Sequence, residues 1–177
     1  MAAFWRVGGA AATLMPLMSA ARVLGIDLGT RRVGVAVSDA LGMTAQPLIT
    51  LERHGGKRDL DAVGRYVTEF AVGRIVVGLP VNPEATGLDD PRARSEKLAR
   101  DFAERLRAHF GLPVELVDES FSTVEAESIL LQADLSRARR KEVVDRLAAA
   151  VILQRWLDSP AGKQVFAKEG VDGHATH

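Results

Sequence analysis

The sequence predicts one α/β domain with a five-stranded mixed sheet and helices on both faces. Short runs rich in branched apolar residues alternate with longer stretches that have the apolar spacing of helices. The first three strand-like runs follow one another without a helix between them, which indicates an antiparallel part of the sheet. A chain of 177 residues suits one domain and is too short for two ordinary ones.

The first three strands are expected to form a meander. Val23–Ile26 and Val33–Val37 are apolar runs joined by a glycine-containing turn, a pattern typical of a hairpin. Pro47–Leu51 is the third expected strand. No helix is expected within this part of the chain.

Helices and strands alternate from there on. Asp59–Val72 has helical spacing, and Gly73 is expected to end that helix. Helical crossovers separate the later strands, so these strands should be parallel and covered on both faces. The remaining expected elements are the strand Arg74–Pro80, the helix Pro91–Phe110, the strand Pro113–Val117, a helix from Ser122, and a last helix from about Ser136 to Leu157.

Residues 23–158 are expected to form the folded domain, between two ends of different character. Residues 1–22 lack acidic side chains, and we interpret them as a disordered extension or a start codon placed too early. A cleaved secretory signal is the alternative. Their apolar run is too short to span a bilayer, so no membrane association is expected. Residues 159–177 are expected to be a flexible tail.

The overall charge does not indicate a nucleic-acid partner, because Lys+Arg and Asp+Glu both number 23. Any site for a polyanion must therefore depend on local charge. The chain has no cysteine, which excludes disulfides and thiolate zinc sites. The four histidines fall in expected loops, at a helix end or in the tail, and we do not expect them to be catalytic.

Three carboxylates are the candidate catalytic and metal-binding residues. Asp27 ends the first strand, and Glu119 follows the last one, where open α/β sheets place their sites. Asp145 lies inside the last helix beside a small apolar stripe that should face the sheet. A charge in that position is costly unless it is paired, with Lys141 as the candidate partner, or bound to a metal. Clustered carboxylate oxygens suit Mg²⁺ or Mn²⁺, and these ions catalyse phosphodiester hydrolysis.

Positive charge is concentrated near two of these acids. Arg31 and Arg32 follow the first strand, and a second group opens the last helix. Both groups are candidates for binding phosphates, although a solvated helix start explains the second group equally well. The second group consists of Arg137, Arg139, Arg140 and Lys141.

Four segments of the chain follow one another in the order Gly25–Asp39, Val77–Pro80, Val117–Glu119 and Val144–Gln154. Together they resemble the motifs of the YqgF/RuvX family, and the similarity covers Arg22 to about Asp158. The resemblance implies a ribonuclease H-like fold related to Holliday-junction resolvases, with Asp27, Glu119 and Asp145 as the metal-binding acids. Members of this family are described as nucleases that trim the 5′ end of the precursor of 16S ribosomal RNA in the bacterial cytoplasm.

The sequence departs from the family pattern at two places. Ser120 stands where the family usually has an arginine after its Asp-Glu pair, so one expected substrate contact is missing. Ser122–Glu125 still has the pattern of a helix capping box. The loop Val81–Asp90 is longer than usual, with Gly87 displaced.

Several alternatives remain open from the sequence. A four-way DNA junction is a second candidate substrate, and a ribosome-assembly or transcription factor without catalysis is a candidate from another class. Gly25–Thr30 also resembles the phosphate-binding hairpin of actin-like and Hsp70-like ATPases, but this chain lacks room for the second domain that they need. Both a monomer and a dimer are compatible with the sequence.

Overall fold

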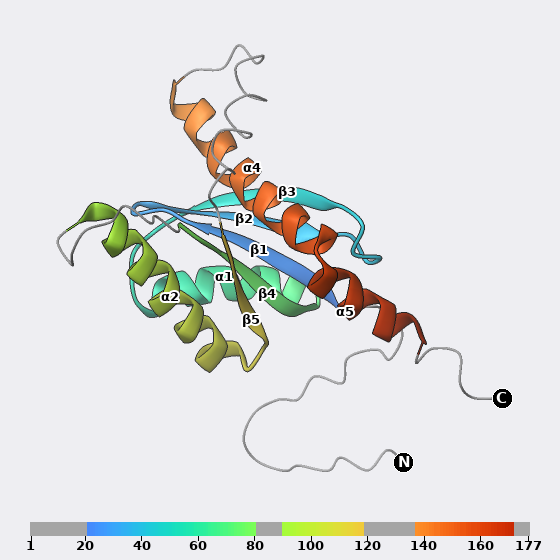
Figure 1. Cartoon of the computed structure of the whole chain (residues 1–177). Coiled ribbons are helices and arrows are strands. Elements are labelled where there is room, and N and C mark those ends of the chain that lie inside the picture. Colours follow the sequence, from blue (N-terminus) through green and yellow to red (C-terminus); the bar gives the residue numbers. More distant parts are fainter. Residues whose placement is uncertain (1–20, 81–89, 119–136, 172–177) are drawn as a thin grey trace, which may run out of the picture.

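The computed structural model describes residues 21–80, 90–118 and 137–171, and within them a single five-stranded sheet in the order β3-β2-β1-β4-β5 (Figure 1). The strands β1 to β3 form an antiparallel meander, and β4 and β5 run parallel to β1. This confirms the predicted mixed sheet. The strands are β1 (Arg22–Leu28), β2 (Arg32–Ser38), β3 (Ala45–Glu52), β4 (Val72–Leu79) and β5 (Val114–Asp118).

Helices cover both faces of this sheet (Figure 1). The helices α1 (Lys57–Glu69) and α2 (Pro91–Phe110) pack on one face, around a core that includes Ile26, Phe102 and Leu106. The long helix α4 (Arg137–Asp158) crosses the other face. The core between α4 and the sheet consists of small and apolar side chains, so the helix can lie close to the strands. These residues include Val23, Ala36, Val76, Ala149, Ile152, Leu153 and Trp156.

The end of α1 differs from the prediction. The helix stops at Glu69, and Ala71 adopts a left-handed backbone with φ 50°. Gly73 is not the helix stop, because it already lies in β4, where an added Cβ would meet the Cβ of Ala21 at 2.3 Å. The glycine therefore permits a close approach of two chain segments, and a non-glycine residue makes the turn.

The predicted flexible tail from residue 159 is wrong for its first part. Residues Pro160–Val171 form α5, which packs against α4 through Val165 and Phe166. The side chain of Ser159 accepts a hydrogen bond from the amide of Gly162 at 3.2 Å, which caps the new helix. The predicted helix from Ser122 lies outside the described residues.

No helix in the described part of the chain is long and apolar enough to cross a membrane.

Candidate metal and nucleic-acid site

Asp27 lies near the end of β1, on the face that α4 covers. Side chains alternate between the two faces along a strand. Leu24 and Ile26 belong to the core beneath α1 and α2, whereas Val23 belongs to the core beneath α4. Asp27, four residues after Val23, therefore faces α4, and it is partly buried there.

The backbone of Asp145 packs directly against the strand beside Asp27. Asp27 and Gly34 are cross-strand partners in the β1–β2 ladder. A Cβ atom added to Gly34 would lie 2.0 Å from the carbonyl oxygen of Asp145, so only a glycine allows α4 to come this close. The structure thus places the backbone of Asp145 against the strand partner of Asp27.

Arg32 is the charged neighbour of Asp145 that the structure shows. Its Nη1 atom lies 3.8 Å from Oδ2 of Asp145, and the two side chains are 28% and 21% exposed. Arg32 precedes Gly34 by two residues in β2, so both residues face α4. The side chain of Lys141, the partner considered from the sequence, lies outside the described part of the structure.

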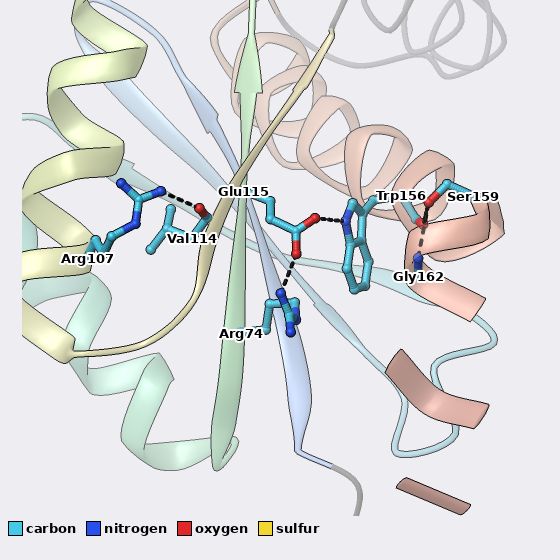
Figure 2. A network of polar contacts seen from close by, with 7 residues as sticks. All are labelled: Arg74, Arg107, Val114, Glu115, Trp156, Ser159 and Gly162. Carbon is cyan, nitrogen blue, oxygen red and sulfur yellow. Dashed lines mark hydrogen bonds and ion pairs between the residues drawn. The ribbon is translucent and has the colours of Figure 1, made fainter. Parts of the chain in front are cut away.

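The second half of α4 is fixed to β5 and to the segment that leads into β3. Figure 2 shows the contact with β5: Trp156 donates from Nε1 to one carboxylate oxygen of Glu115 at 2.8 Å, and Arg74 binds the other oxygen. Gln154 accepts a hydrogen bond from the amide of Ala45 at 2.8 Å. These contacts fix the position of the helix along the sheet, and hence the height of Asp145 above β2.

The third predicted acid, Glu119, lies outside the described residues. Its predecessor Asp118 is the last residue of β5 and pairs with Leu79 in the β4–β5 ladder. Arg155 donates from Nη1 to the carbonyl oxygen of Asp118 at 3.1 Å, which ties this strand end to α4. Because β1, β4 and β5 are parallel, the end of β5 lies at the same edge of the sheet as the end of β1.

The predicted phosphate-binding residues fall into two groups. Arg31 is exposed in the turn after β1, and Arg32 is half-buried beside Asp145. The second group lies at the start of α4, one to two turns before Asp145, and its side chains are outside the described part of the structure. It consists of Arg137, Arg139, Arg140 and Lys141.

A buried pair that sequence patterns did not reveal supports the turn after Asp27. Asp59 is only 3% exposed and accepts hydrogen bonds from the amides of His54 and Gly55 at 2.8 and 3.0 Å. Arg53 pairs with this carboxylate and also donates from Nη1 to the carbonyl oxygen of Gly29 at 3.0 Å. An acid in the first turn of a helix, close after an arginine, was the only sequence signal for this pair.

The donor chemistry near Asp27 and Asp145 fits a divalent cation. Carboxylate oxygens are hard ligands, which Mg²⁺ and Mn²⁺ prefer. Within residues 21–80, 90–118 and 137–171, no group of three or more His, Asp or Glu side chains is arranged to hold a metal. Glu119 lies outside these ranges, and it stays the predicted third ligand.

Comparisons with known proteins identify the family of the chain. A family model described as "RuvX: Holliday junction resolvase" matches residues 21–159. A protein of Myxococcus xanthus (strain DK1622) is 49% identical over 138 residues, which cover 78% of this chain and 88% of the relative. A protein of Symbiobacterium thermophilum is 48% identical over 142 residues, covering 80% and 95%. Both relatives are named "Putative pre-16S rRNA nuclease".

Among solved structures, RuvC of T. thermophilus in complex with a Holliday junction substrate aligns with a TM-score of 0.50. The alignment has 16% identity and covers 80% of this chain and 97% of RuvC, so it shows a shared ribonuclease H-like fold. The family and the named relatives indicate a hydrolase that acts on the phosphodiester bonds of nucleic acid, in an enzyme class that generally uses divalent metals. The match over residues 21–159, together with these identities, shows that the chain belongs to the RuvX family.

Proposed function

We propose that this protein uses Asp27, Glu119 and Asp145 to bind Mg²⁺ or Mn²⁺ and that it trims the 5′ end of pre-16S ribosomal RNA. The close approach of α4 to β2 at Gly34 carries the proposal, because it brings the backbone of Asp145 against the strand partner of Asp27. The names of the relatives support the substrate. In bacteria this RNA is made in the cytoplasm, where we place the activity.

The balance of charge supports a divalent ion. Two carboxylates about 4 Å apart repel each other by roughly 4 kcal/mol at an effective dielectric near 20. Before a metal binds, three carboxylates and the guanidinium of Arg32 together carry a net charge of −2, which attracts a divalent cation. When bound, such an ion makes water a nucleophile at neutral pH and offsets the charge that develops on the phosphate.

The remaining residues of the proposed site orient the acids and the substrate. Gly34 sets the distance between α4 and β2, and Arg155 holds the strand end that precedes Glu119. Arg31 is exposed in the turn after β1, where it can neutralise a substrate phosphate. The arginines and Lys141 at the start of α4 would extend this contact along the nucleic-acid backbone.

A four-way DNA junction is the second candidate substrate, because the matching family model is described as a resolvase and the fold is that of RuvC. The metal chemistry is the same for both substrates, since each presents a phosphodiester. The contacts to the sugar and to the shape of the helix would distinguish them.

A cleavage assay tests the proposal. Wild-type protein is incubated with a pre-16S RNA fragment, with single-stranded RNA and with a four-way DNA junction, each in Mg²⁺, Mn²⁺ or chelator. We expect metal-dependent cutting of the RNA precursor, and no cutting by Asp27→Asn or Asp145→Asn. The control is Asp61→Asn, which removes an acid from an exposed pair with Lys57 on α1 and should cut normally.

Each outcome discriminates between the candidate functions. Cutting of the junction alone would replace the RNA substrate with DNA. Full cutting by Asp27→Asn would refute the proposed site. Binding of the precursor without cutting in either metal would indicate an assembly factor that keeps the fold and lacks the chemistry.

A further inference from the structure

Arg32 forms an ion pair with Asp145 that is too long for a hydrogen bond between the two atoms. The 3.8 Å between Nη1 and Oδ2 is within reach of an ion pair but well beyond the usual 2.7–3.2 Å of an N–H···O hydrogen bond. The Nη1 atom is buried, and it has no hydrogen-bond partner among the described residues. A buried donor left in this way costs free energy, so the guanidinium would gain from moving to an acceptor.

Arg53, which directly follows the neighbouring strand β3, is an arginine that two groups hold in place. Its Nη1 donates to a carbonyl oxygen at 3.0 Å, and its Nε lies 3.4 Å from the buried carboxylate of Asp59. Two different groups therefore hold that side chain in place. Arg32 lacks this second restraint at Nη1 and faces the rim of the sheet where the acids lie.

We propose that Arg32 is a built-in counterion of Asp145 that competes with the divalent cation, and that its guanidinium turns to a substrate phosphate when the cation binds. This inference rests on the proposed function and adds a coupling between its two ligands. One carboxylate cannot accept a bound dication and keep a guanidinium in full contact without repulsion between the two cations. Arginine is suited to the second position, because its planar fork matches the geometry of a phosphate.

The competition has a definite sign. Removing the positive charge of Arg32 leaves Asp145 less neutralised in the unliganded protein and removes the repulsion felt by an incoming cation. Both effects favour the metal, so the affinity for Mn²⁺ should rise by about tenfold or more. A residue that only supported the fold would leave this affinity unchanged or lower it.

The same contact links metal to nucleic acid. If the cation releases Arg32 toward a phosphate, the cation should raise the affinity for nucleic acid. By thermodynamic reciprocity, nucleic acid should raise the affinity for the cation by the same factor. Without Arg32, that factor should become smaller, because only the attraction between the cation and the phosphate remains.

The test measures Mn²⁺ affinity by calorimetry for wild type, Arg32→Gln and Arg32→Met, with Arg32→Lys as the conservative variant. Arg32→Met is included in case Arg32→Gln folds poorly, because methionine keeps an apolar stem of similar length. Arg100→Gln is the matched control, because it removes one positive charge from an exposed pair with Glu96 on α2. In parallel, the affinity for fluorescein-labelled single-stranded RNA and for a labelled four-way DNA junction is measured in chelator and in Ca²⁺.

We expect Mn²⁺ to bind about tenfold more tightly to Arg32→Gln and Arg32→Met than to wild type, and to bind Arg32→Lys and Arg100→Gln like wild type. We also expect the gain in nucleic-acid affinity caused by Ca²⁺ to be smaller in the two uncharged variants than in wild type. Equal or weaker Mn²⁺ binding by both uncharged variants would overturn the counterion role and leave the nuclease intact. The proposed metal site itself would be contradicted by a different result: wild type shows no saturable Mn²⁺ binding, or shows binding that Asp145→Asn does not remove.

Discussion

The substitution Gly34→Ala should push α4 away from β2 and so separate Asp145 from Asp27. A Cβ atom on residue 34 would lie 2.0 Å from the carbonyl oxygen of Asp145, 2.5 Å from its carbonyl carbon and 3.2 Å from the amide nitrogen of Arg146. All three are backbone atoms, so no side-chain rotation relieves the clash. Since ordinary contacts of a Cβ begin at 3.4 Å, the helix must retreat by roughly 1.4 Å.

The retreat should affect function more than stability. Overpacking of this kind costs about 1–3 kcal/mol, and the rest of α4 stays anchored through Gln154 and Trp156. A misplacement of about 1 Å at a catalytic group lowers rates on the order of 100-fold. Urea unfolding gives the first quantity, and the cleavage rate at saturating Mn²⁺ gives the second.

The control is Gly64→Ala on α1, where the added Cβ would meet only the ring of Phe110, at 3.1 Å. This substitution is made in a helix and far from the site, so the rate should equal that of wild type. If Gly34→Ala cuts at the wild-type rate and binds Mn²⁺ normally while losing stability, the spacing of α4 does not place Asp145, and the reasoning is refuted.

Three further predictions concern the parts that support the site. Asp59→Ala should lower the free energy of urea unfolding by about 3 kcal/mol, because it leaves Arg53 and two amides without their buried acceptor. The control Asp61→Ala, in an exposed pair, should lower it by less than about 1 kcal/mol. Trp156→Phe keeps an aromatic ring but removes part of the buried indole and its hydrogen bond to Glu115, so it should cost at least about 1.5–3 kcal/mol. A loss under half of that would show that the bond is not formed in solution. At Asp39, burial acts to raise the pKa, but hydrogen bonds from the amides of Thr44 and Met43 outweigh it and lower the pKa below 3.8. The ionised Asp39 therefore contributes to stability above pH 3.8, and this contribution is lost as the pH falls through the lowered pKa. The stability difference between wild type and Asp39→Asn should shrink in acid. A difference that does not depend on pH would contradict this.

Local patterns in the sequence predicted most of the fold. The helix Pro91–Phe110 was predicted at its observed bounds, because a proline begins it and a glycine follows its end. The errors arose where tertiary contacts decide the structure. Gly73 was predicted to be a helix stop, but it allows a close approach to Ala21. The helix α5 was not predicted, because it depends on the packing of Phe166 against the apolar core beside α4.

The sequence also indicated candidate residues for the site, which stay a prediction. Strand ends and helical periodicity were enough to single out Asp27 and Asp145. The neighbour of Asp145 could not be predicted in this way, because Arg32 comes from a strand that is over a hundred positions away in the sequence. Periodicity along one helix indicates neighbours on that helix, such as Lys141. It cannot indicate a partner on the sheet below. The pair of Arg53 and Asp59 was missed for the same reason, since it supports a turn from outside that turn.

Diffraction from crystals soaked in Mn²⁺, recorded at the manganese absorption edge, tests the central claim most directly. We predict an anomalous peak bonded to carboxylate oxygens of both Asp27 and Asp145, at about 2.1 Å as for small hard cations. A structure at saturating Mn²⁺ with no peak between these two carboxylates, and with Asp145 still beside Arg32, would contradict it.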